Sequence, residues 1–259
     1  MMPQYIEVNG HPVYSYEWDN NGEAVVLLHG GLSQTSHWDS YILPAIETGF
    51  HPFAYDRTAH GFTGDREGSM HFDSQAREAI SYLETVVHEP AHLIGYSDGG
   101  IVSLLVALQR PDLVRSIIAL GANFQPDGVL LLDDFDGVIS EENQKEYDQT
   151  SPDAPETLPK KIRKMIEIQR TQPNISIDEL ATIQCPVLVM AGDDDVIKHS
   201  HTVELYESIP LGQLAILPGT SHKFIKEKPA LAQLLIREFL EDLSYPITRM
   251  PIRRTNPVL

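Results

Sequence analysis

The segment Gly95–Gly100 reads Gly-Tyr-Ser-Asp-Gly-Gly and places a serine between glycines two positions away on either side. It follows the apolar run His92–Ile94 and precedes the helix-forming stretch Ile101–Leu108. On a sharp strand-to-helix turn a serine presents its hydroxyl above the sheet, and glycines are needed there because side chains would collide with neighbouring backbone. The pattern predicts Ser97 as a nucleophile beside a helix N-terminus, where the backbone N–H of Asp98 helps to hold an oxyanion.

A serine hydroxyl is a poor nucleophile until a base removes its proton and a third group orients the base. Both partners are present downstream, at the ends of two apolar runs. Val187–Met190 leads into Ala-Gly and the three aspartates Asp193–Asp195, and Leu214–Leu217 leads into Pro-Gly-Thr-Ser and His222. Acidic loops and isolated histidines are commonly only structural, but the order serine, acid, histidine at strand ends favours a catalytic triad.

The elements that must position these residues follow from hydrophobic periodicity. Apolar or alternating runs predict strands at 5–8, 12–17, 24–28, 52–55, 91–96, 114–120, 187–190 and 214–217. Helical patterns lie at about 38–47, 74–87, 99–109, 199–208 and 229–240. This rhythm predicts the α/β class, with a mostly parallel, doubly wound sheet, helices on both faces and ligands at the carboxyl ends of the strands.

Two segments depart from that rhythm and suggest the domain organisation. We expect one catalytic domain over 1–242 with a small helical lid inserted at about 123–180, a stretch in which 127–156 holds ten acidic residues and one basic residue. A solvated helical face is the alternative for that stretch. The tail 243–259 is basic and contains three prolines, which disfavour a helix. The sequence leaves three possibilities open for this tail: packing on the acidic body, contact with a second subunit, or disorder.

Composition limits the partners and the compartment. The 259 residues are 42% hydrophobic and 22% charged, as in soluble globular proteins, and the formal net charge is −18. This balance argues against binding of nucleic acid; it favours either steering of cationic substrates or simple solubility. The apolar runs are too short to span a bilayer, the first residues do not resemble a signal peptide, and the single Cys185 fits a reducing compartment. We therefore expect a cytoplasmic protein without a membrane partner; homo-oligomers are compatible with the sequence.

From His29 to the helix after His222, the chain resembles the α/β-hydrolase superfamily. The resemblance implies Asp195 as the triad acid, with Asp193 as the alternative. It also implies that the His-Gly-Gly turn at 29–31 supplies the N–H of Gly31 to the oxyanion hole together with that of Asp98; Leu32 is the alternative donor. The segment 56–63 is similar to the Asp-x-Arg-Gly-x-Gly-x-Ser turn of the family but replaces several of its residues.

Ser-Asp-Gly-Gly at 97–100 is similar to a subgroup of the superfamily that includes the valacyclovir hydrolases (biphenyl-hydrolase-like proteins). That resemblance implies that the carboxylate of Asp98 binds the α-amino group of amino-acid esters. Capping of the following helix is the competing interpretation, because Asp is favoured at helix N-termini. Leu32 and His37 are further candidates to line the substrate pocket, with plain packing as the alternative for His37.

These observations predict hydrolysis of small carboxylic esters through an acyl-enzyme on Ser97, without a cofactor. A nucleophilic Asp98 is disfavoured because Tyr96 stands where the turn would then need glycine. Metal chemistry is not supported, since the histidines are scattered and no zinc motif occurs. Enol-lactone or carbon–carbon bond hydrolysis on the same triad, or ligand binding with little turnover, are the alternatives.

Overall fold

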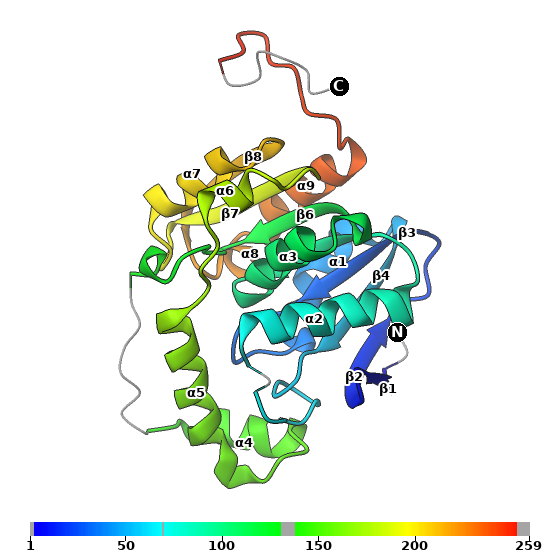
Figure 1. Ribbon diagram of the computed structural model, residues 1–259, viewed down its shortest axis with the longest axis vertical. Helices are drawn as coiled ribbons and strands as arrows, with labels where there is room; N and C mark the ends of the chain where they lie inside the picture. The colour runs from blue at the N-terminus through cyan, green and yellow to red at the C-terminus, as the bar shows by residue number, and fades with distance from the viewer. Residues whose placement is uncertain (1–2, 69, 131–137, 253–259) are drawn as a thin grey trace.

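The computed structural model describes residues 3–68, 70–130 and 138–252. One eight-stranded sheet runs through it in the order β1-β2-β4-β3-β5-β6-β7-β8 (Figure 1). The strands are β1 (Gln4–Val8), β2 (His11–Glu17), β3 (Gly22–Leu28), β4 (Gly49–Asp56), β5 (Ala91–Tyr96), β6 (Val114–Leu120), β7 (Val187–Asp194) and β8 (Gly212–Ser221). The β1–β2 and β2–β4 pairs are antiparallel and the remaining pairs are parallel, which confirms the predicted sheet.

Helices cover both faces of this sheet. They are α1 (Asp39–Ile46), α2 (Phe72–Tyr82), α3 (Asp98–Gln109), α4 (Glu141–Thr150), α5 (Leu158–Thr171), α6 (Ile177–Leu180), α7 (His199–Ser208), α8 (Phe224–Glu227) and α9 (Pro229–Glu241). Strand β3 shows why two layers form, because its buried side chains alternate. Ala24, Val26 and Leu28 pack in the core with α2 and α3, whereas Val25 and Leu27 pack in the core with α1 and α9.

Two strands run further than their apolar residues predict. Strand β7 continues through Asp193 and Asp194, and β8 continues through the segment 218–221. The two strands keep pairing past a register shift between Gly192 and Asp194. The acidic and histidine-bearing ends of β7 and β8 are therefore held side by side by backbone hydrogen bonds as well as by loops.

The insertion after β6 contributes α4, α5 and the short α6. Figure 1 shows α4 and α5 as an arm at one end of the molecule, below the body of the sheet. Helix α5 buries Leu158, Lys161, Met165 and Ile168, one stripe of the helix, whereas α4 buries none of its residues. The part of the predicted lid at 131–137 lies outside the described residues, and its action as a lid stays a prediction.

The chain after α9 leaves the body of the molecule (Figure 1). Residues 243–252 form no helix, as their prolines predict, and Ile247, Met250 and Ile252 are strongly exposed. Two of the tail's arginines, Arg253 and Arg254, lie outside the described residues.

Candidate active site

Ser97 occupies the sharp turn between β5 and α3. Its backbone has φ +52°, in the left-handed region that non-glycine residues rarely adopt. The flanking glycines are required by space, since a Cβ at Gly95 would lie 2.2 Å from the carbonyl oxygen of Gly99. A Cβ at Gly99 would lie 1.9 Å from the carbonyl oxygen of Leu28. The sequence therefore folds here into a strained turn that only its glycines allow.

His222 follows β8 and is hydrogen bonded to Asp195, with 2.7 Å between Nδ1 and Asp195 Oδ1. Burial alone would raise the pKa of Asp195, but the hydrogen bond and charge of His222 and the N–H groups of Ile197 and Gly192 outweigh it. The pKa of Asp195 thus lies below its ordinary value, and the carboxylate is ionised at neutral pH. Asp193 points elsewhere and accepts the N–H of Thr220 at 2.9 Å.

Tyr96 contacts both the backbone and the ring of His222. Its hydroxyl donates to the carbonyl oxygen of His222 at 2.8 Å, and the two rings stack with centroids 5.4 Å apart. The ring of Trp38 also stacks with that of Tyr96, with centroids 6.0 Å apart, and Trp38 is almost fully buried. Tyr96, the residue before Ser97, thereby holds the loop that carries His222 in place.

The hydroxyl of Ser97 has no hydrogen-bond partner among the described residues. A catalytic hydrogen bond is often long in a free enzyme and shortens only when substrate is bound. The geometry thus joins the histidine to its acid and leaves the serine hydroxyl unengaged.

The turn after β3 lies against the start of α3. Within the described residues, the N–H groups of Gly31 and Asp98 donate to no acceptor. Arg57 is fully buried and holds this turn by donating to the carbonyl oxygens of His29 and, at 3.2 Å, of Gly30. Leu32, the alternative donor, has φ +47° and a side chain that is largely exposed.

The side chain of Asp98 does not cap its helix. Ser97 is the N-cap residue, and neither carboxylate oxygen of Asp98 accepts a backbone N–H; instead, Gln169 Nε2 of α5 lies 3.1 and 3.2 Å from the two oxygens. The carboxylate also lies over Gly31, where an added Cβ would approach Oδ2 to 2.2 Å. Burial raises the pKa of Asp98, although nearby Arg57 and the Gln169 amide oppose the shift. The competing interpretation as a helix cap is therefore wrong, because the carboxyl group points toward the insertion.

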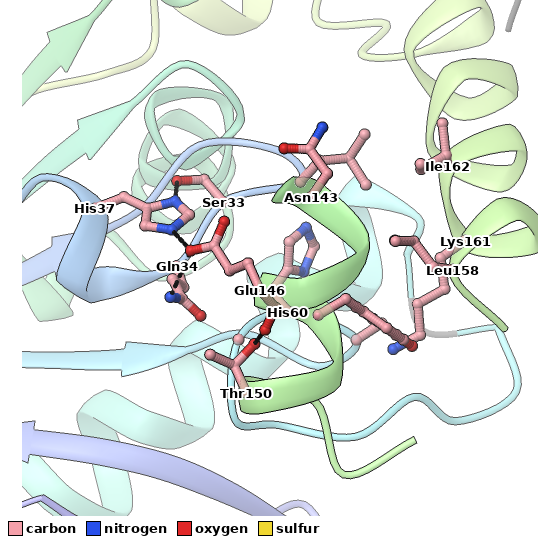
Figure 2. Close-up of a pocket in the computed structure, with 14 residues that line it drawn as sticks. Ser33, Gln34, His37, His60, Asn143, Glu146, Thr150, Leu158, Lys161 and Ile162 are labelled. Carbon is pink, nitrogen blue, oxygen red and sulfur yellow. Dashed lines mark hydrogen bonds and ion pairs between the residues drawn. The ribbon is translucent and has the colours of Figure 1, made fainter. Parts of the chain in front are cut away.

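A cavity of about 220 Å³ opens next to the Gly31 turn, between the loops after β3 and β4 and the helices α4 and α5 (Figure 2). Leu32 and His37 line it, and their role in binding substrate stays a prediction. His37 is not merely packed, since its Nε2 pairs with Glu146 of α4 and its Nδ1 lies 3.2 Å from the hydroxyl of Ser33. Neither Ser97 nor His222 lines this cavity.

Several residues of the site could not be identified from the sequence patterns. Tyr96 is the variable position of the glycine–serine turn, and Gln169 and Glu146 belong to helices whose docking is set by tertiary packing. Gln169 could have been identified only by predicting which residues of the insertion face the carboxyl ends of the strands.

Comparison with known proteins identifies relatives in sequence and in fold. The sequence model described as "Alpha/beta hydrolase family" matches residues 25–231. The serine hydrolase BPHL of Mus musculus is 23% identical, over 91% of this chain and 85% of that protein. None of the helices in the described part of the chain has the length and apolar character needed to span a bilayer.

Two solved structures share the fold. The meta-cleavage product hydrolase of Pseudomonas fluorescens IP01 superposes with a TM-score of 0.70 at 22% identity, over 92% of this chain and 97% of that one. An esterase from Exiguobacterium antarcticum superposes with a TM-score of 0.73 at 16% identity, over 93% of this chain and 100% of the other. At these identities the likeness concerns the fold alone.

Proposed function

The chain belongs to the alpha/beta hydrolase family, and we propose that it is a serine hydrolase that cleaves small carboxylic esters through Ser97, His222 and Asp195. The observation that carries this proposal is the 2.7 Å hydrogen bond between His222 and Asp195 beside the strained turn of Ser97. Three separate strand ends supply these groups, in the order that a nucleophile on this kind of turn requires.

In the first step, Ser97 Oγ attacks the ester carbonyl while His222 Nε2 accepts its proton. Asp195 accepts the Nδ1–H hydrogen bond, which holds the imidazole in the tautomer whose Nε2 lone pair faces the serine. The unengaged N–H groups of Gly31 and Asp98 receive the oxyanion; in serine proteases one such donor contributes about 3 kcal/mol. His222 then returns the proton to the leaving alcohol, and a water molecule activated by His222 releases the acid. No cofactor takes part.

The direct test is hydrolysis of p-nitrophenyl acetate by wild type and by Ser97→Ala. We expect the substitution to abolish turnover above the rate of the uncatalysed reaction with the fold intact by circular dichroism. Equal activity of the two proteins would contradict the proposal.

A second candidate, preference for amino-acid esters, is favoured by the side chain of Asp98. This carboxylate is almost fully buried, yet its direct hydrogen-bond donor among the described residues is the neutral amide of Gln169. A substrate ammonium that displaced this amide would form a direct charge-assisted hydrogen bond with the carboxylate next to the nucleophile, in addition to the nearby charge of Arg57. The same displacement would couple substrate binding to movement of α5.

This preference is tested with p-nitrophenyl alaninate and its N-acetyl derivative. The ratio of kcat/KM between the free-amine and acetylated esters is expected to fall about tenfold or more in Asp98→Asn, since a charge-assisted hydrogen bond is worth roughly 1.5–3 kcal/mol. Asn preserves the backbone N–H, so oxyanion binding is left in place. An unchanged ratio would contradict ammonium binding by Asp98 but would leave the proposal of ester hydrolysis at Ser97 standing.

Enol-lactone and carbon–carbon bond hydrolysis use the same triad and are the competing reactions. A panel that contains simple esters, an enol lactone and a vinylogous 1,5-diketone separates them by kcat/KM. A protein that binds these compounds but turns over none of them would instead be a ligand-binding member of the fold.

A further inference from the structure

Tyr96 is the last residue of β5 and connects the strand of the nucleophile to the histidine. Its hydroxyl donates to the backbone carbonyl oxygen of His222 at 2.8 Å, although the two residues are 126 positions apart. Among the described residues, no other donor reaches that oxygen. Burial raises the pKa of Tyr96, and the charges of Asp195 and Glu227 add to the shift. The hydroxyl therefore stays protonated and keeps donating at neutral and moderately alkaline pH.

The hydrogen bond to Asp195 does not by itself place the imidazole. It fixes Nδ1, but His222 lies in the short connection between β8 and α8, so its backbone must be fixed separately. The hydroxyl of Tyr96 fixes that backbone, and its ring stacks on the imidazole with 5.4 Å between centroids and 28° between planes. Tyr96 thus holds the same histidine at its main chain and at its ring.

The ring of Tyr96 also lies beside the turn after β3. A Cβ at Gly30 would approach Cδ1 of Tyr96 to 3.3 Å and Cβ of Ser97 to 3.4 Å. Trp38, which is 1% exposed, stacks with Tyr96 as well and restricts its movement. One confined side chain at the end of β5 therefore lies next to both the histidine and the Gly30 turn, and the serine is the next residue along the chain.

Plain packing is the competing explanation, because most buried tyrosines pair their hydroxyl groups. Tyr82 shows that case in the same chain. Its hydroxyl donates to the carbonyl oxygen of Ala54 at 3.0 Å, and its ring stacks on that of Tyr55 with 4.4 Å between centroids. Neither Ala54 nor Tyr55 belongs to the candidate active site. Tyr82 therefore matches Tyr96 in the kind of contacts it makes but not in the residue it holds.

We propose that Tyr96 is a positioning residue for ester hydrolysis: its hydroxyl and its ring hold His222 where Nε2 takes the proton of Ser97. The inference rests on the proposed function, in which these two residues are the base and the nucleophile. Proton transfer needs hydrogen-bond reach, and a misplacement of about 1 Å costs on the order of 10²-fold in rate. Because Tyr96 and Ser97 are adjacent in the chain, the end of β5 sets the positions of both partners in this transfer.

Removal of the hydroxyl tests the proposal. In Tyr96→Phe, we expect kcat for p-nitrophenyl acetate to fall about fivefold or more, as the loss of one good neutral hydrogen bond would give. KM should stay within about twofold, because His222 is the base in both acylation and deacylation and both steps slow together. Tyr96→Leu removes the ring as well and should lower kcat on the order of 10²-fold.

Tyr82→Phe is the matched control, since it also removes a tyrosine hydroxyl from a buried carbonyl oxygen. Both Phe variants should lower Tm, whereas Tyr82→Phe should keep the kcat of wild type. A kcat that is unchanged in both variants, or reduced equally in both, would overturn the proposal. A change in Tyr96→Phe that is confined to KM would overturn it as well.

Proton NMR tests the geometry without turnover. The Nδ1–H of His222, hydrogen bonded to Asp195, should give a far-downfield resonance that is lost in His222→Ala. This resonance should broaden through faster exchange with water in Tyr96→Phe and stay sharp in Tyr82→Phe. An equally sharp resonance in both variants would contradict the inference, even if kcat fell in Tyr96→Phe.

A measurement on wild type covers the case in which no Tyr96 variant folds. The ring current of the stacked tyrosine should shift the carbon-bound ring hydrogens of His222 upfield of their positions in the unfolded chain. The absence of an upfield shift would contradict the inference. Failure of the proposed function looks different: wild type would hydrolyse no ester, while both NMR measurements would still report the contact between Tyr96 and His222.

Discussion

Asp193, near the end of β7, and Asp195, just after it, differ in what they contact, and this difference predicts different roles. Asp195 accepts from His222, whereas Asp193 accepts from the backbone of Thr220. In Asp195→Asn, the amide would stabilise the wrong imidazole tautomer, and we expect kcat to fall about 10³–10⁴-fold, as in a serine protease. Asp193→Asn is the matched control and should keep kcat within a few-fold. Steady-state kinetics on p-nitrophenyl acetate measures kcat for both variants. A larger loss of kcat in Asp193→Asn than in Asp195→Asn would indicate Asp193 as the triad acid.

Burial of Asp98 has a consequence for stability. Its pKa is raised in the folded protein, so ionisation costs folding free energy at every pH above that pKa, and the cost disappears as pH falls through it. Asp98→Asn should therefore raise Tm at pH 8, by about 2–4 °C for each kcal/mol relieved, and this gain should shrink toward pH 4.

The control for this prediction is Asp112→Asn. The pKa of the exposed Asp112 is lowered by the hydrogen bond from Arg110, so its removal should bring no gain in Tm at any pH. Thermal melts of the three proteins across pH 4–8 give the answer. A gain for Asp98→Asn that does not depend on pH would show that the carboxylate carries no such cost.

At the scale of elements, α4 is the least anchored helix of the insertion. It buries none of its residues and is tied to the body through Glu146, which pairs with His37 and Gln34, whereas α5 buries a full stripe. Few buried contacts mean a low free energy of local opening. We expect amide hydrogens of α4 to exchange faster than those of α5, and Glu146→Ala to accelerate exchange in α4 further.

Hydrogen-exchange mass spectrometry checks this for peptides of the two helices. Glu142→Ala is the control, because Glu142 lies on the same helix but its side chain has no hydrogen-bond partner among the described residues. Equal acceleration by both substitutions would mean that the contact with His37 does not hold the helix in place.

The elements also show what the sequence could predict. The strands and the turn of Ser97 were predictable because buried parallel strands are continuous apolar runs and because strained turns demand glycine. The contacts of Gln169 with Asp98 and of Glu146 with His37 were not, since they join residues more than 70 positions apart through the docking of polar helices. The helix-cap interpretation of Asp98 failed for the same reason: local preference was overruled by a partner from the insertion.

In the whole molecule, the sheet order brings the functional groups of three distant segments to one edge. β3, β5, β6, β7 and β8 are consecutive and parallel, so the turns after them meet at their carboxyl ends. The chain has a net charge of −18, from which we expect that it has no phosphate-backbone partner. Catalysis by Ser97 is the central claim for the molecule, and every other role assigned above depends on it.

Labelling with a fluorophosphonate tests that claim most directly, because the reagent reacts with an activated serine and forms a stable phosphonyl ester. We predict one adduct per chain, located by peptide mass spectrometry on Ser97, with ester hydrolysis lost in proportion to labelling. His222→Ala should label far more slowly, since the base is missing. Stoichiometric labelling at another residue, or ester hydrolysis that survives complete modification of Ser97, would contradict the account.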